Sequence, residues 1–210
     1  DARKGNILWR TPLFEVDNPA PVHWLNSWAT PTPVVESGRI YCDFGTFGTA
    51  CLNSKSGRIQ WKTQVPVDHQ VGPGSSPILY KKLLVLVRDG RDAQFVAALD
   101  KKTGKQAWRT ERPPIDASNG NLKKSFVTPL IVKAAGHEQM ISPGAHWVVS
   151  YDPANGREFW RARHGNGFSI GSCPVFNEGV AYFSTGCMKP QMCAFRVDGE
   201  WRLGDHQLRF

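Results

Sequence analysis

The middle of the chain reads Ala98-Leu99-Asp100-Lys101-Lys102-Thr103-Gly104-Lys105-Gln106-Ala107-Trp108. Its skeleton is an acid or amide, a glycine four residues later and a tryptophan eight residues later, and this skeleton recurs along the sequence. The other copies are Asn53, Gly57 and Trp61; Asp152, Gly156 and Trp160; Gly5 with Trp9, which keep the second half; and Gly199 with Trp201, a degenerate remnant. A motif that returns at a fixed spacing indicates a structural repeat.

Each residue of the skeleton suits a β-hairpin. Asp100 ends an apolar run and can accept hydrogen bonds from the backbone of the next turn, and Gly104 can supply the positive φ of a tight reversal. Trp108 and Arg109 then fall on opposite faces of the following strand, because side chains alternate there. The pattern predicts strands with one buried and one solvated face, docked through a tryptophan whose indole N–H needs a backbone acceptor in the adjoining unit.

The composition is that of a folded, β-rich protein. Hydrophobic residues make up 40% of the 210 positions, and the 20 glycines and 15 prolines fall mostly between short apolar runs, which is typical of strands joined by turns. No apolar run approaches the ~18 residues of a membrane-spanning helix, and Asp1-Ala2-Arg3-Lys4 does not resemble an uncleaved signal peptide. We therefore expect no membrane span.

The net charge of +8 is scattered along the chain. One cation follows each repeat tryptophan, and others occupy expected turn tips such as Lys81-Lys82 and Lys101-Lys102. Nucleic-acid-binding proteins usually gather their charge on one face among exposed aromatic residues. The scatter predicts a solvated rim and no nucleic-acid partner.

One strand over residues 7–13 precedes four similar units. Each unit opens with a small residue and a proline, as in Thr32-Pro33 and Ser76-Pro77, and proline at the first position of a strand removes no ladder hydrogen bond. Four strands are expected per unit, and successive repeat tryptophans lie about 40 to 50 residues apart, which is the length of one propeller blade. We predict blades at about residues 32–65, 76–112, 127–163 and 173–204.

The predicted fold is therefore an all-β, partial β-propeller over residues 1–210, with about four four-stranded blades and one N-terminal strand. In a closed ring, residues 7–13 would complete a blade whose other three strands lie elsewhere. We expect the N-terminal half of a seven- or eight-bladed ring. An open arc would expose apolar blade edges and favour self-association.

The segments Ala98 to Trp108 and Val149 to Trp160 resemble the repeat of the pyrroloquinoline-quinone-type β-propellers, the superfamily of quinoprotein alcohol dehydrogenases and the outer-membrane-assembly lipoprotein. Three further stretches are similar to exported bacterial propeller proteins of this type: Gly5-Asn6-Ile7-Leu8-Trp9-Arg10, Gly74-Ser75-Ser76-Pro77 and Ile141-Ser142-Pro143-Gly144-Ala145. The resemblance covers nearly the whole chain. It implies a complete ring of about seven or eight blades and an exported location, periplasmic or associated with the outer membrane.

The resemblance also implies what a catalytic member would carry: two adjacent cysteines over the quinone, and Glu, Asn and Asp ligands to a calcium ion. The cysteines here are nowhere adjacent; they are Cys42, Cys51, Cys173, Cys187 and Cys193. We therefore predict no cofactor, with pyrroloquinoline quinone and calcium as the alternative.

Strand alternation divides the loops between two faces. The connectors between blades share one face with the loops that join second to third strands, and the repeat turns lie on the other. The first face is the predicted binding face, since long polar loops suit a binding surface. Its candidate residues are His23, Trp24, His69, Arg88, Asp89, Lys124, His146 and His164.

No close Cys/His motif and no Gly-x-Ser-x-Gly elbow occurs, so neither a metal site nor a serine nucleophile is predicted. The stretch Phe44-Gly45-Thr46-Phe47-Gly48 lacks the Lys-Ser/Thr ending of a phosphate loop and is expected to be a hairpin tip. If residues 45–48 form a four-residue loop, Cys42 faces Cys51 and the two can form a disulfide; buried free thiols are the alternative.

These observations favour a non-enzymatic propeller platform in the bacterial cell envelope, with a protein or glycan partner. One alternative is a fragment of a pyrroloquinoline-quinone-dependent dehydrogenase. Another is a polysaccharide-binding or polysaccharide-active propeller, in which Trp24 and Trp28 stack on sugars. An active one would need two carboxylates in one cleft, for which Asp89 and Asp92 are weak candidates because they suit turns.

Overall fold

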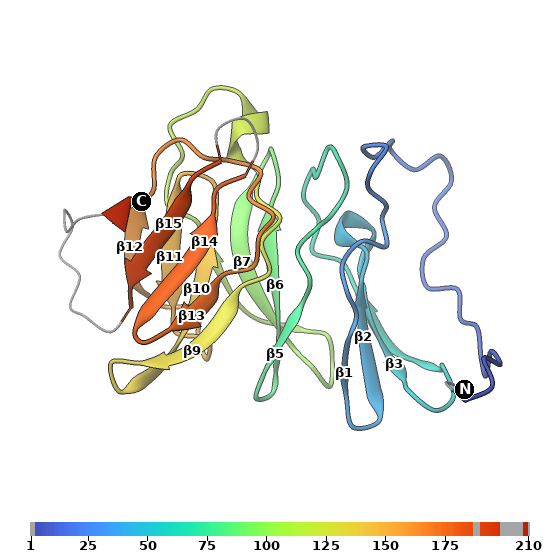
Figure 1. The fold of residues 1–210 in the computed structure, drawn as a ribbon. Coiled ribbons are helices and arrows are strands. Elements are labelled where there is room, and N and C mark those ends of the chain that lie inside the picture. The colour runs from blue at the N-terminus through green and yellow to red at the C-terminus, as the bar shows by residue number, and fades with distance from the viewer. Residues whose placement is uncertain (1–2, 187–189, 198–207, 210) are drawn as a thin grey trace.

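The computed structural model describes residues 3–186, 190–197 and 208–209, and Figure 1 shows four β-sheets standing side by side. Each sheet is antiparallel, has four strands and is built from consecutive strands of the chain. The expected all-β architecture of four-stranded units is confirmed. In the described part of the chain, no helix is long and apolar enough to cross a membrane.

The strands follow one another in chain order. The first sheet holds β1 (Val34–Glu36), β2 (Arg39–Asp43), β3 (Thr49–Asn53) and β4 (Ile59–Thr63). The second holds β5 (Ile78–Tyr80), β6 (Leu83–Asp89), β7 (Gln94–Asp100) and β8 (Gln106–Glu111). The third holds β9 (Leu130–Ala134), β10 (His137–Pro143), β11 (Trp147–Tyr151) and β12 (Glu158–Arg163). The fourth holds β13 (Val175–Asn177), β14 (Val180–Ser184), β15 (Met192–Arg196) and β16 (Leu208–Arg209), and two short 3-10 helices are η1 (Gly45–Phe47) and η2 (Gly120–Lys123).

The hairpin between the third and fourth strands has one geometry in the first three sheets. In the second sheet the Gly104 N–H donates to Asp100 O at 2.8 Å, and Asp100 Oδ1 accepts from the N–H groups of Lys102 and Thr103 at 3.0 and 2.9 Å. Gly104 has a φ of +72°, and the equivalent glycines, Gly57 and Gly156, have φ values of +70° and +76°. The skeleton of the repeat therefore forms a turn that is closed by its own acid or amide.

The tryptophan of one sheet packs on the repeat glycine of the next. A Cβ atom added to Gly104 would lie 2.6 Å from Cε3 of Trp61, and the Trp61 indole N–H donates to Lys101 O at 3.1 Å. Trp108 covers Gly156 in the same way, with a corresponding distance of 2.6 Å to its Cε3. The repeat glycine thus meets two needs, a positive φ and a surface flat enough for an indole ring.

Residues 7–13 form no strand in the described part of the chain, where none of the strands runs beside them to share a ladder. The blade that they are predicted to complete has its other strands elsewhere, so this assignment stays a prediction. The N-terminal segment instead runs beside the first sheet (Figure 1), where Trp9 covers Gly57 and Thr11 Oγ1 donates to Gly57 O at 2.8 Å. Thr110 makes the same bond to Gly156 O. The segment therefore lies where the fourth strand of a preceding sheet would lie.

The hydrophobic core lies between successive sheets, and β6 shows this best because all of its residues are buried. Leu84 and Leu86 belong to the cluster shared with the first sheet, whereas Val85 and Val87 belong to the cluster shared with the third. A strand covered on both faces has no polar side, which explains the unbroken apolar run in the sequence. The first described sheet receives the N-terminal segment on its other side.

The fourth sheet extends beyond the boundary expected at residue 204. Its last strand, β16, pairs Arg209 with Cys193 and Leu208 with Ala194. The degenerate repeat residues Gly199 and Trp201, like Cys187, lie outside the described residues.

The predicted disulfide between Cys42 and Cys51 is wrong, and both cysteines are free. The loop after β2 is one residue longer than assumed, since Asp43 pairs with Thr49 and the loop contains η1. This register places Cys42 opposite Ala50. Because neighbouring residues of a strand point to opposite faces, the two thiols point away from each other.

Candidate functional site

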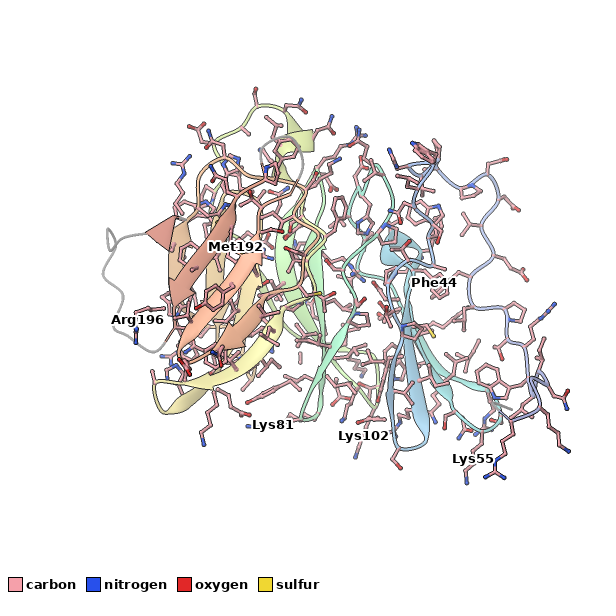
Figure 2. The ribbon with its side chains drawn as sticks, viewed as in Figure 1. Phe44, Lys55, Lys81, Lys102, Met192 and Arg196 are labelled. Atoms are coloured by element: carbon pink, nitrogen blue, oxygen red, sulfur yellow. The ribbon has the colours of Figure 1, made fainter. Side chains whose placement is uncertain are left out.

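One end of the sheets carries the long loops, and we call it the loop face. It consists of the connectors between sheets and the loops between second and third strands, which gather at the upper end in Figure 1. The connectors are residues 64–77, 112–129 and 164–174, and the loops are 44–48, 90–93 and 144–146. The N-terminal segment begins at the opposite end, where Trp9 covers Gly57, and reaches the loop face before β1. The repeat turns form the opposite end, which we call the turn face, where Lys55, Lys81 and Lys102 project (Figure 2).

Most of the residues predicted to form the binding face lie beneath it. Only His23 and Trp24 are exposed, and Trp24 is 83% exposed. The six buried residues are His69, Arg88, Asp89, Lys124, His146 and His164. These six polar side chains therefore form a layer beneath the loops and support them.

Arg88 joins the first two sheets. Its guanidinium donates to both carboxylate oxygens of Asp43, at 2.6 and 3.1 Å, and its Nε donates to Val65 O at 2.9 Å. Arg88 is 1% exposed and the Asp43 side chain is fully enclosed. A buried, bidentate pair of this kind fixes orientation, because either charge alone would be costly to bury.

Asp89 holds Arg112, which links the second sheet to the third through Ser142. Arg112 donates to its two oxygens at 3.0 and 2.9 Å and also donates to Ser142 O at 2.8 Å. Asp89 is 3% exposed, so it does not share a cleft with Asp92, which is exposed in the next loop. Of the two carboxylates considered for sugar chemistry, Asp89 is buried and Asp92 is exposed, so they do not face a common cleft.

The buried histidines are uncharged at neutral pH. Burial, helped by the neighbouring Arg88, lowers the pKa of His69 to about 4. Burial also lowers the pKa of His164 to about 4, and its Nε2 lies 2.9 Å from Gly144 O. Burial and Arg163 lower the pKa of His146. Desolvation disfavours the imidazolium in each case, so these side chains do not add positive charge to the loop face.

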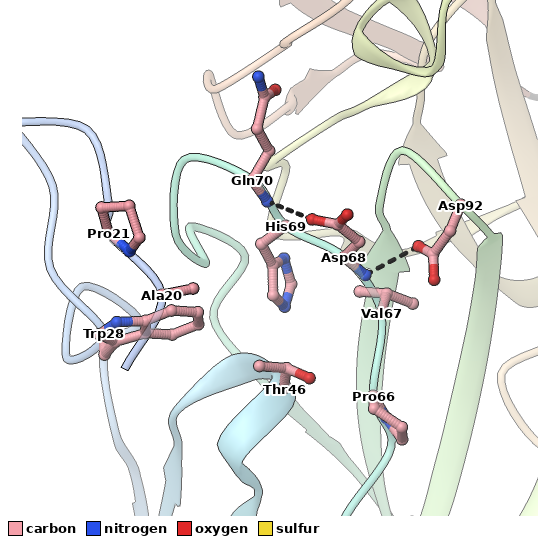
Figure 3. Close-up of a pocket in the computed structure, with 10 residues that line it drawn as sticks. All are labelled: Ala20, Pro21, Trp28, Thr46, Pro66, Val67, Asp68, His69, Gln70 and Asp92. Atoms are coloured by element: carbon pink, nitrogen blue, oxygen red, sulfur yellow. Dashed lines mark hydrogen bonds between the residues drawn. The ribbon is translucent and has the colours of Figure 1, made fainter. Parts of the chain in front are cut away.

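A pocket of about 370 Å³ opens on the loop face between the first two sheets (Figure 3). Ten residues line it: Ala20, Pro21, Trp28, Thr46, Pro66, Val67, Asp68, His69, Gln70 and Asp92. This volume is at the lower end of the usual range for small-molecule sites, about 300–1,000 Å³. The lining combines an indole ring, aliphatic surface and two carboxylates, and that mixture can orient a small polar or charged group.

The polar wall of the pocket is held by its own backbone. Asp68 Oδ1 accepts the Gln70 N–H at 2.9 Å, and the Asp68 N–H donates to Asp92 Oδ1 at 2.8 Å. Arg91 Nε donates to Asp68 Oδ2 at 2.5 Å. The His69 ring packs against Gly45, where an added Cβ would lie 2.7 Å from Nε2. These contacts preform the pocket.

Sequence reasoning identified His69 and noted Trp28 and Asp92, but it missed Asp68 and Gln70 as site residues. The run Pro66-Val67-Asp68-His69-Gln70 is a polar stretch in a connector, and that was the available signal. Asp92 belongs to the loop of a different sheet. Only the docking of one sheet against the next brings these groups together.

The residues present do not fit the quinone and calcium of the dehydrogenase alternative. In the described ranges, no three His, Cys, Asp or Glu side chains gather into a group that could hold a metal ion. The cysteines are separated in sequence, and the described ones lie in different strands or loops. The donor set for that cofactor is not formed by these residues.

Comparison with known proteins identifies the family. A profile of the family described as outer membrane protein assembly factor BamB matches residues 1–142. The chain belongs to this family. A curated relative, the quinohemoprotein alcohol dehydrogenase ADH-IIG of Pseudomonas putida, is 27% identical over 145 residues, which cover 62% of this chain and 19% of the relative.

Solved structures of the same kind share the fold. The quinohemoprotein alcohol dehydrogenase ADHIIG of Pseudomonas putida matches 94% of this chain and 35% of its own, with a TM-score of 0.66 and 15% identity. BamB from Moraxella catarrhalis matches 80% of this chain and 46% of its own, with a TM-score of 0.59 and 13% identity. The predicted partial propeller is thereby confirmed. This chain spans about a fifth of the curated relative and less than half of either structure.

Proposed function

We propose that this chain is part of a non-enzymatic β-propeller of the bacterial envelope that binds a polypeptide partner through its loop face. One observation carries the proposal: Arg88 and Asp89 of the predicted site are engaged in buried ion pairs, with Asp43 and Arg112 respectively, while a preformed pocket beside them stays open. The family description, an outer membrane protein assembly factor, supports both the location and a protein partner.

The arrangement of charge argues against catalysis by these residues. A general base or nucleophile must reach the open space in which the substrate lies. Arg88 instead donates to Asp43 and to Val65 O, and Arg112 donates to Asp89 and to Ser142 O. These hydrogen bonds and ion pairs hold three sheets in a fixed arrangement, which is what a rigid binding platform requires.

The second candidate is a dehydrogenase fragment, and the likeness to quinohemoprotein alcohol dehydrogenases favours it. Fold is shared among many functions, so that likeness alone does not carry the activity. Calorimetric titration of the full-length protein with pyrroloquinoline quinone and calcium separates the two candidates. Saturable binding would favour the dehydrogenase and contradict the platform.

Site-specific photo-crosslinking tests the platform directly. A photoreactive phenylalanine derivative replaces Trp24 on the loop face or, as the matched control, Lys102 on the turn face of the full-length protein in the cells that make it. Both positions are exposed. We expect a discrete protein adduct from position 24 and none from position 102. Equal adducts from both positions, or none from either, would contradict binding through the loop face.

A further inference from the structure

The pocket between the first two sheets has an unbalanced charge. Two of its ten lining residues are charged, and both are aspartates. Asp68 is paired with Arg91, which is not among the lining residues. Asp92 makes no ion pair with any residue that the structure describes, and one of its oxygens accepts the Asp68 N–H. The lining residues therefore carry about one negative charge in excess, held in place by the backbone; outside the lining, the buried Lys124 ammonium donates to Gln70 Oε1.

The remaining walls suit an organic cation. Trp28 lies on one side of the pocket in Figure 3 and is braced by Phe47, with ring centroids 4.1 Å apart. An indole face attracts ammonium and guanidinium groups through its quadrupole. His69 lies in the middle of this view; because burial lowers its pKa to about 4, it does not repel a cation at neutral pH. The aliphatic surfaces of Pro21 and Val67 can cover a hydrocarbon stem.

We propose that this pocket binds an ammonium or guanidinium group, presented by a lysine or arginine side chain of the polypeptide partner. The inference rests on the proposed function and specifies the chemistry of its partner. A neutral sugar would use the same indole face, but it would not balance the charge of Asp92. A pocket of about 370 Å³ admits one long side chain of the partner. The rest of the partner's surface would contact only the rim of the pocket.

Calorimetry on the full-length protein tests the inference with defined probes. These are a blocked Gly-Lys-Gly peptide, the same peptide acetylated at Nζ, n-butylammonium and cellotetraose. We expect saturable, salt-sensitive binding of the lysine peptide, weaker binding of n-butylammonium, and no binding of the acetylated peptide or cellotetraose. Salt sensitivity follows because exposed charges are screened.

Two pairs of variants locate the binding. Asp92→Asn removes the charge but keeps the Oδ1 acceptor for the Asp68 N–H; Asp116→Asn, in an exposed loop of the same face, changes the net charge equally. Trp28→Leu removes the indole wall, and Trp147→Leu, in β11 of the third sheet, removes an indole outside the pocket. We expect Asp92→Asn and Trp28→Leu each to weaken binding of the lysine peptide, and Asp92→Asn to lower the affinity about tenfold or more. The two controls should leave it unchanged, and thermal melting confirms that all four variants fold.

Each other outcome overturns the inference in a recognisable way. Binding of n-butylammonium as tight as that of the peptide would assign the pocket to free amines, and binding of cellotetraose would assign it to sugars. If Asp92→Asn and Asp116→Asn weaken peptide binding equally, the effect comes from the net charge of the protein and not from the pocket. If no probe binds while position 24 still crosslinks to a protein, the cation inference fails and the platform stands; if crosslinking fails as well, both fail.

Discussion

Replacing Gly104 with alanine tests the contact that joins the repeats. Gly104 has a φ of +72°, and a Cβ at this position would lie 2.6 Å from Cε3 of Trp61. The ring cannot move away freely, because Trp61 is 8% exposed and its indole N–H is bonded to Lys101 O. Gly136 provides the matched control, since its φ is +78° and an added Cβ would meet nothing within 4 Å.

The size of the effect follows from two separate costs. A left-handed φ costs an alanine about 1–2 kcal/mol, and both variants incur it. Forcing an extra methyl group into a packed contact costs about 1–3 kcal/mol, and only Gly104→Ala incurs that. We therefore expect Gly136→Ala to lower the free energy of unfolding by about 1–2 kcal/mol and Gly104→Ala to lower it by about 2–5 kcal/mol.

Urea unfolding of the full-length protein, followed by far-UV circular dichroism, measures both values. The difference between the two variants should disappear when Trp61 is replaced by leucine, because the atom that collides with the new methyl group is then gone. Equal destabilisation by Gly104→Ala and Gly136→Ala would refute the reasoning. So would a difference that persists without Trp61.

Three further predictions concern the buried polar layer and the cysteines. Asp43→Ala leaves a buried guanidinium without its partner and should lower the free energy of unfolding by about 3–5 kcal/mol, measured by the same urea titration; an effect below 1 kcal/mol would contradict a buried pair. Burial lowers the pKa values of His69 and His164 to about 4, below the unfolded value of about 6.5, so the stability they contribute is present above pH 6.5 and is lost as the pH falls towards 4. Acidification from pH 7 to pH 5 should therefore cost about 1–2 kcal/mol per histidine, and a flat profile over that interval would be inconsistent with neutral buried imidazoles. Alkylation of the unfolded, unreduced protein should modify both Cys42 and Cys51, as measured by peptide mass spectrometry; a pair of peptides linked through these residues would show that they form a disulfide.

The repeat itself could be read from the sequence because its information is local. Asp100 and Gly104 close their own turn, and the glycine's positive φ is a property of a few consecutive residues. Short strands bounded by such turns can be recognised by the alternation of apolar and polar residues along them. The four-stranded units followed from that spacing, and so did their order in the chain.

The errors lay where local information was insufficient. The loop after β2 has one residue more than the expected four, because Asp43 and not Phe44 pairs with Thr49. This shift of one residue in the register places Cys42 and Cys51 on opposite faces of the sheet. Arg88 and Asp89 looked like exposed loop charges, yet their partners, Asp43 and Arg112, lie more than 20 positions away.

The sequence by itself determined the repeating hairpin, the all-β class and the sheet-to-sheet docking residues, because each depends on residues within one turn of each other or on a motif that recurs. Only the tertiary structure decided which polar groups are buried, that Cys42 and Cys51 point to opposite faces of their sheet, and that Trp28, Asp68 and Asp92 line one pocket. The physical reason is that burial and convergence depend on how separate sheets pack, and the free energy of that packing comes from contacts between residues far apart in the chain.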